Sequence, residues 1–129
     1  GEEHPATATS YNNLASVYKC LGEYKKAEEL YEKSLRIRER ALGEEHPDTA
    51  TSYNNLAGIY LVRREYQAAL SYYVKAYRIY TNKFGIGHPH TRIIFENVER
   101  AYAEWKPNGN FSQWFKEKTD QWQAERKNP

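Results

Sequence analysis

The chain has 129 residues, the size of one compact domain, so we expect a single domain over residues 1–129. Its 19 Lys and Arg against 17 Asp and Glu leave a net charge of +2, which gives no reason to expect nucleic acid or an anionic membrane as partner. A lone cysteine excludes an internal disulfide, and the longest apolar run, at 56–62, falls far short of the roughly 20 residues that cross a bilayer. Since no secretory signal opens the sequence either, a cytoplasmic location is expected.

A repeat with a period of 42 residues runs through the sequence. The recurring segments are GEEHP at 1–5 and 43–47, its variant GIGHP at 85–89, and TATSYNNLA at 7–15 and again at 49–57. A fixed period of about 20 to 50 residues is typical of solenoids and related repeat architectures. We therefore divide the chain into three units, 1–42, 43–84 and 85–127.

The first half of unit one has the pattern of an amphipathic helix. Its apolar and small residues recur every three or four positions, on one face that we expect to be buried: Tyr11, Leu14, Ala15, Tyr18 and Leu21. The pair His4 and Pro5 is expected to begin this helix, because proline suits the first helical position. Gly22 is expected to end it, since glycine tolerates the left-handed conformation that is common at helix exits. Cys20, just before, is expected to be a half-buried small residue.

The second half of unit one predicts another helix, packed against the first. Small and apolar residues form its inner side: Tyr24, Ala27, Tyr31, Ser34 and Leu35. Charged residues form its outer side: Lys25, Lys26, Glu29, Lys33, Arg36 and Arg40. With 12 tyrosines against 4 phenylalanines in the chain, tyrosine is expected to supply much of the core. Two such helices cannot bury their apolar faces alone, so the units are expected to stack.

This pattern resembles the tetratricopeptide repeat, a helix-turn-helix unit. The residues that carry the resemblance have the order and spacing of that motif: Leu14, Ala15, Tyr18, Gly22, Tyr24, Ala27 and Tyr31. The usual unit has about 34 residues, so about eight more lengthen the second helix and add the GEEHP connection. Units of this longer type are similar to the repeats of kinesin light chain and nephrocystin-3. The resemblance implies an all-α fold, a right-handed superhelical α-solenoid of antiparallel helix pairs that binds a partner protein in its concave groove.

Unit three departs from the pattern and is expected to act as a cap. Glu99 stands where units one and two have a small alanine. After a turn-rich loop, an insertion aligns Gly109 with Gly22 and Trp114 with the contact residue Ala27. Bulk at that position should prevent the last helix from packing as its predecessors do. We expect a C-terminal capping helix that ends near residue 127, with one aromatic face: Phe111, Trp114, Phe115 and Trp122.

Asparagines recur in phase through all three units, at Asn13, Asn55 and Asn97. The family resemblance places them on the concave side of the first helices, where primary amides would bind the backbone of an extended peptide irrespective of its sequence. Alternatively, they would bond neighbouring helices and brace the stack. We favour peptide binding, with Lys19 and Arg100 available for a carboxylate of the partner. The candidate groove residues are Asn12, Asn13, Ser16, Lys19, Asn54, Asn55, Gly58, Glu96, Asn97 and Arg100.

Other functions find little support in the sequence. It contains no catalytic motif, no phosphate-binding glycine loop and no cluster of metal-ligand residues, so we expect a non-enzymatic scaffold without a metal or cofactor. The small net charge, together with Glu96 in the groove, argues against RNA binding. The competing hypothesis is an assembly or spacer role. In it, the chain is a piece of a longer repeat protein and self-associates through the uncovered edge of unit one.

Overall fold

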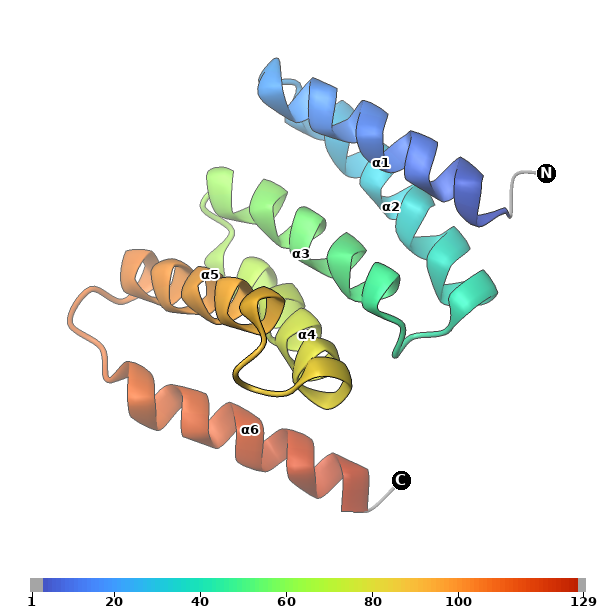
Figure 1. Ribbon diagram of the computed structural model, residues 1–129. Coiled ribbons are helices and arrows are strands. Elements are labelled where there is room, and N and C mark those ends of the chain that lie inside the picture. Colours follow the sequence, from blue (N-terminus) through green and yellow to red (C-terminus); the bar gives the residue numbers. More distant parts are fainter. Residues whose placement is uncertain (1–3, 128–129) are drawn as a thin grey trace.

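The computed structural model describes residues 4–127, and all regular elements in that part are α-helices (Figure 1). The helices are α1 (Pro5–Cys20), α2 (Tyr24–Leu42), α3 (Pro47–Val62), α4 (Tyr66–Phe84), α5 (Pro89–Trp105) and α6 (Phe111–Lys127). Helices α1 and α2, and then α3 and α4, form antiparallel pairs that stack, which confirms the predicted all-α solenoid. The first three residues of the opening GEEHP segment and the last two residues of the chain lie outside the described part. No described helix is long and apolar enough to cross a membrane.

A histidine and a proline begin the first helix of every unit, as predicted. The histidine is the N-cap and the proline lies in the first turn of α1, α3 and α5. Nδ1 of His46 accepts a hydrogen bond from the Asp48 N–H at 3.0 Å, and His4 and His88 accept the equivalent bond. Backbone N–H groups at a helix start have no partner within the helix, so each imidazole satisfies one of them. The recurring histidines are therefore helix caps.

The turns between paired helices use a left-handed residue. Gly22 has a φ of 79° after α1, in line with its predicted role at the helix exit, and Arg64 takes a φ of 62° in the same place after α3. Gly109 aligns with Gly22 in sequence and serves another purpose, because a β-carbon on it would collide with the phenol of Tyr102. Glycine before α6 thus permits the Tyr102 ring to pack closely against the loop.

Small residues and tyrosines fill the contact between paired helices. Ala27, Tyr31, Ser34 and Leu35 of α2 are buried, which confirms most of the predicted inner side. The Ser34 hydroxyl donates a hydrogen bond to the carbonyl oxygen of Ala8 in α1 at 2.8 Å. The predicted outer side of α2, with its lysines and arginines, is exposed. The small side chains allow the two backbones to approach closely, and the hydroxyl satisfies a buried polar group there.

Arg38 joins unit one to unit two. Its guanidinium donates hydrogen bonds to the Ser52 hydroxyl at 2.9 Å and to the carbonyl oxygen of Asp48 at 3.2 Å, both in α3. Burial lowers the pKa of Arg38, and the nearby charge of Asp48 opposes that change. A buried cation is tolerated only when it is paired or hydrogen-bonded, and these acceptors supply that partnership.

The face of α1 that the sequence predicts to be buried is only partly so, because Tyr11 and Tyr18 are half-buried and its two leucines are exposed. Ala15 is buried, but Leu14 and Leu21 are 44% and 67% exposed, so the prediction is wrong for these two leucines. Leu56 holds the Leu14 position in unit two and is fully buried in a core cluster that includes residues of α2. No described helix packs on the corresponding side of α1, which explains the difference. Cys20, at the end of α1, is exposed rather than half-buried as predicted.

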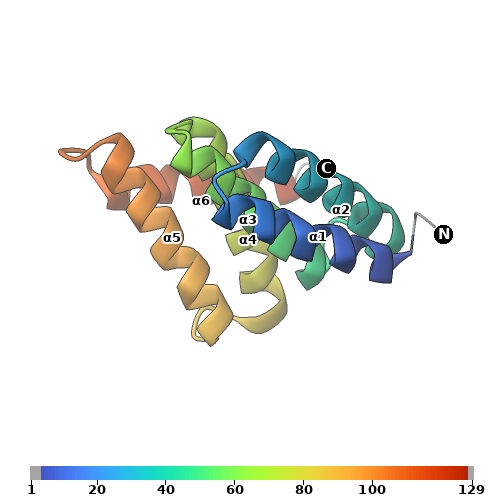
Figure 2. The same ribbon diagram turned by 90° about the horizontal axis from the view of Figure 1, so that it is seen from above.

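The capping helix α6 packs across α4 and α5. Figure 2 shows it running at an angle to α5, whereas α1 and α2 run side by side. The ring of Phe115 lies 5.3 Å from that of Tyr77 in α4 and 5.3 Å from that of Phe95 in α5, measured between centroids. Glu99 is exposed, although the alanines at its position in units one and two are fully buried. Helix α6 therefore packs differently from α2 and α4, as predicted, and the bulk of Trp114 as the cause stays a prediction.

Candidate functional site

The first helices of the three units, α1, α3 and α5, follow one another on one side of the molecule, with α2 and α4 behind them (Figure 1). All of the candidate groove residues belong to these three helices. We call the surface that carries Asn12, Lys19, Asn54 and Arg100 the first-helix face; Gly58 lies buried beneath the end of the Lys19 side chain. Hydrogen bonds and close contacts between neighbouring first helices hold these residues in place.

The recurring asparagines bond one unit to the next. Nδ2 of Asn55 donates to Oδ1 of Asn12 at 2.7 Å, and Nδ2 of Asn97 donates to Oδ1 of Asn54 at 3.1 Å. Each bond runs from the second asparagine of one unit to the first asparagine of the preceding unit. This arrangement is the one expected if the amides brace the stack.

The amides retain the capacity to bind a ligand as well. A primary amide has two donors and an acceptor, and each of these bonds uses one donor of Asn55 or Asn97. Asn13, at their position in unit one, is exposed. Glu96 is also exposed. It lies at the unit-three position that corresponds to Asn54, so unit three has a carboxylate where unit two has an amide. The row of asparagines therefore braces the helices and leaves hydrogen-bonding groups on the first-helix face.

A second group of residues meets where Lys19 reaches unit two. Its Nζ lies 3.0 Å from the position that a β-carbon on Gly58 would occupy, and the Tyr73 hydroxyl lies 3.9 Å from the same position. Burial raises the pKa of Tyr73, the charge of Glu104 adds to this change, and the charge of Arg100 opposes it. Lys19 of unit one and Tyr73 of unit two therefore meet at Gly58, and the charges of Arg100 and Glu104 in unit three act on the pKa of the Tyr73 phenol.

Sequence reasoning missed Tyr73, although the repeat contains a signal for it. In unit one the Ser16 hydroxyl lies 2.8 Å from the Tyr31 hydroxyl and donates to the Asn12 carbonyl, so the candidate Ser16 is engaged inside the stack. A shift of 42 residues replaces this pair by Gly58 and Tyr73. Glycine lacks the hydroxyl, and the Lys19 ammonium lies beside the resulting space. Comparison of the units at these positions would have identified Tyr73.

The groups on this face can form hydrogen bonds and ion pairs with a ligand. Within residues 4–127, no group of three or more His, Cys, Asp or Glu side chains is placed to hold a metal ion. The face presents an ammonium, a guanidinium, carboxylates and amides on rigid helices. These groups suit the backbone and an acidic side chain of an extended peptide.

Replacing Asn55 by alanine is expected to lower the free energy of unfolding by about 1 kcal/mol, because it removes a hydrogen bond and leaves the half-buried Asn12 amide without its donor. Asn13→Ala is the matched control at an exposed site and is expected to change that free energy by less than about 0.5 kcal/mol. Urea unfolding followed by circular dichroism measures both. Equal losses in the two variants would show that the asparagine bond does not brace the stack.

Solved structures with the same fold include long repeat proteins. BtubC (BKLC) from P. vanneervenii is 29% identical over 78% of this chain and 40% of its own, with a TM-score of 0.73. A Podosopora anserina protein described as a kinesin light chain with nearly identical TPR-like repeats is 29% identical over 78% of this chain and 47% of its own, with a TM-score of 0.72. A second crystal structure, of a substituted form with the same description, is 26% identical over 100% of this chain and 60% of its own, with a TM-score of 0.73. This chain thus spans less than two thirds of the length of these proteins.

A family model also matches the sequence of this chain. The chain matches the tetratricopeptide repeat family over residues 6–82 and again over 48–106, which together span α1 to α5. No match was found among curated proteins. Both the family match and the solved structures confirm the resemblance to repeats of the kinesin light chain type. The chain belongs to the tetratricopeptide repeat family.

Proposed function

We propose that the chain binds an extended segment of a partner protein on its first-helix face, as a non-enzymatic interaction module. Tetratricopeptide repeats are generally protein–protein interaction modules. The observation that supports a site on this face is the meeting of Lys19, Gly58 and Tyr73, with Arg100 close enough to influence the Tyr73 pKa. Lys19 of unit one thus lies close to the buried Tyr73 of unit two.

The chemistry of the face defines the segment it would take. The asparagines along α1, α3 and α5 offer amides to the backbone of a peptide that crosses the three helices. Lys19 and Arg100 favour an acidic side chain opposite Gly58, because a carboxylate would form charge-assisted hydrogen bonds with them. Glu96 and Glu104 disfavour a second acidic side chain toward unit three. The proposed ligand is therefore an extended peptide with one acidic residue at its centre.

Selection from a random peptide library on the purified protein tests this proposal, followed by calorimetry on variants. Gly58 is buried, and a β-carbon there would lie 3.0 Å from the Lys19 ammonium, so we expect Gly58→Leu to displace that ammonium and to weaken peptide binding at least tenfold. Lys19→Gln is expected to weaken binding about fivefold through the loss of one charge pair. Lys25→Gln, on the exposed outer side of α2, is the matched control and should leave affinity unchanged. A library without binders, or a selected peptide that binds Gly58→Leu as tightly as the parent, contradicts the proposal.

The second candidate function, assembly through unit one, is favoured by the uncovered side of α1. Leu14, Val17 and Leu21 form an exposed apolar stripe there, whereas Leu56 and Ile59, at the Leu14 and Val17 positions of unit two, are fully buried. Such a stripe would pack against a helix of another repeat or of a second copy.

We expect concentration-dependent self-association of the chain, and its suppression in Val17→Lys, which places a charge on this stripe. Light scattering over a wide range of protein concentrations measures the average mass. Fusion of a further repeat upstream of α1 should suppress association in the same way. A strictly monomeric parent chain whose oligomeric state is unchanged by both alterations would exclude the assembly role.

A further inference from the structure

The uncovered side of α1 has nearly the same residues that α3 buries where α2 packs on it. Figure 1 shows α1 at the end of the stack, where none of the described helices covers this side. On α3 the corresponding residues are buried: Ser52, Tyr53, Leu56 and Ile59. Their equivalents 42 residues earlier, of which the first three are identical, are Ser10, Tyr11, Leu14 and Val17. We call the side of α1 that carries these four residues and Leu21 the free edge.

Two polar contacts between α2 and α3 show what a helix on the free edge would find. The Arg38 guanidinium donates a hydrogen bond to the Ser52 hydroxyl at 2.9 Å. The Tyr53 hydroxyl donates a hydrogen bond to the Glu39 carboxylate at 3.1 Å. Because the free edge has the same serine and tyrosine, a helix that covers it in the same way would bring an arginine followed directly by a glutamate.

A third position distinguishes the free edge from α3. Nη1 of Arg63, at the end of α3, lies 3.0 Å from Oε1 of Glu28 in α2. Unit one has Leu21 at the Arg63 position, and that leucine is 67% exposed. A carboxylate packed on a leucine would lose water without gaining a partner. The helix that fits the free edge therefore has an apolar residue at the Glu28 position.

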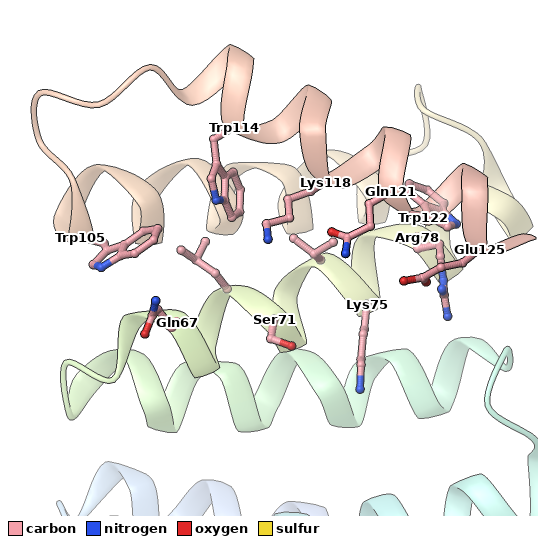
Figure 3. A pocket seen from close by; sticks show the side chains of 12 residues that line it. Gln67, Ser71, Lys75, Arg78, Trp105, Trp114, Lys118, Gln121, Trp122 and Glu125 are labelled. Carbon is pink, nitrogen blue, oxygen red and sulfur yellow. The ribbon is translucent and has the colours of Figure 1, made fainter.

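The junction between α4 and α5 supports this matching of side chains. There Trp105 occupies the Arg63 position, and Leu70 occupies the Glu28 position. Trp105 packs against the apolar cluster that contains Leu70, and both line the cavity of Figure 3, in which Trp105 is labelled. The ion pair of one junction is thus an apolar contact at the next, so the two positions change together.

The serine and arginine positions change together in the same way. At the junction between α4 and α5, Ile94 occupies the Ser52 position and Tyr80 occupies the Arg38 position. Both are buried in the main core cluster. The residue on a first helix therefore indicates the residue on the second helix that covers it, and this rule can be applied to the free edge.

A second copy of this chain does not offer a helix of that kind. Among the described helices, an arginine followed by a glutamate occurs only at Arg38 and Glu39 of α2. Both residues already bond to α3 of their own chain. Self-association through the uncovered side of α1 would therefore use its apolar residues alone.

We propose that the free edge binds a helix of a partner chain in which an apolar residue is followed, after nine residues, by adjacent arginine and glutamate, the spacing of positions 28, 38 and 39 in α2. The apolar residue packs on Leu21, the arginine donates to the Ser10 hydroxyl, and the glutamate accepts from the Tyr11 hydroxyl. Leu14 and Val17 pack against the apolar side of the same helix. This inference rests on the second candidate function and names the partner helix for it.

The probe is a fluorescent peptide with the sequence of residues 24–42, the change Glu28→Leu, and a lactam between the side chains of Glu29 and Lys33. The lactam stabilises a helix that would be marginal in water alone, and both joined residues are exposed in α2. Anisotropy during titration with the full chain should show saturation with a Kd on the order of 10 µM. The peptide that retains Glu28 should bind about tenfold more weakly. In the protein variant Leu21→Arg, which restores the cation of unit two, this preference should reverse.

Further variants locate the contact. Arg38→Gln in the peptide should weaken binding about tenfold, because a charged donor to the Ser10 hydroxyl is lost. Arg36→Gln, on the exposed side of the same helix, is the matched control and should leave the Kd unchanged. Val17→Lys in the protein should weaken binding at least about tenfold. Absence of saturation up to about ten times the expected Kd, an unchanged preference in Leu21→Arg, or equal effects of Arg36→Gln and Arg38→Gln would overturn the proposal.

Light scattering separates this inference from self-association. An excess of the peptide should dissociate any self-associated chains, because both use the free edge. A monomeric chain that binds the peptide with the expected preferences would exclude self-association and support the helix site. Self-association without peptide binding would support assembly through a second copy and contradict the helix site.

Discussion

Leu56→Ala is expected to lower the free energy of unfolding by about 2 to 5 kcal/mol, the usual cost of truncating a fully buried leucine. The side chain lies in the main core cluster, so its loss removes apolar contacts between units one and two and leaves a cavity. Urea unfolding monitored by circular dichroism measures the change. The total free energy of unfolding of a protein of this size is about 5 to 15 kcal/mol, so the variant should melt at a clearly lower temperature.

The matched control is Leu14→Ala, at the same position of the repeat in unit one. Leu14 is 44% exposed, so we expect a loss of less than about 1 kcal/mol. A loss at Leu14 as large as that at Leu56 would mean that the outer side of α1 is covered in solution. Repeating the measurement at several protein concentrations would then show whether a second copy provides the cover.

Alkaline pH is expected to unfold the protein between about pH 10 and pH 12, because several core tyrosines resist ionisation. Burial, followed by Glu28, raises the pKa of Tyr60 to about 12. Burial also raises the pKa values of Tyr53 and Tyr72, with Glu39 and Glu32 adding to the respective changes. Free tyrosine titrates near pH 10, so these phenols favour the folded state fully below pH 10. That contribution is lost as the pH rises toward the folded-state values.

Melting temperatures from pH 8 to pH 12 and absorbance titration of the phenolates test this expectation. In the folded protein, part of the tyrosine titration should lag behind that of the chain in urea. Tyr60→Phe removes one of the ionising groups and should make the decline in melting temperature between pH 10 and pH 12 shallower. A single titration near pH 10 in both the folded and the unfolded chain would show that the core phenols are accessible to water.

The elements set by local sequence were predicted well. The His-Pro starts, the glycine exit of α1 and the inner side of α2 depend on residues within one turn or one helix pair, and the repeat displays them more than once. Burial of Leu14 and Leu21 was predicted wrongly, because it depends on a neighbouring helix rather than on their own periodicity. Apolar residues at helical spacing show which face of a helix could be buried. Whether that face is buried depends on a neighbouring helix that packs against it.

The candidate site was predictable to a lesser extent. The in-phase asparagines identified a set of related positions, but the sequence left open whether their amides bond each other, which requires the relative placement of α1, α3 and α5. Tyr73 was missed because it lies buried on a second helix and comes close to Lys19 only beside Gly58. Likewise, the matched changes at the Glu28 and Arg63 positions become evident only in three dimensions, where the two side chains meet.

Peptide binding on the first-helix face is tested most directly by NMR of the labelled protein during titration with a library-selected peptide. We expect the largest shift changes at the backbone amide of Gly58, at the side-chain amides of Asn13 and Asn55, and around Arg100. Resonances of Lys25 and Lys33, on the exposed outer side of α2, should remain unchanged. Shifts confined to α2 or α4, with Gly58 and the asparagines unaffected by a saturating peptide, would contradict the proposed site.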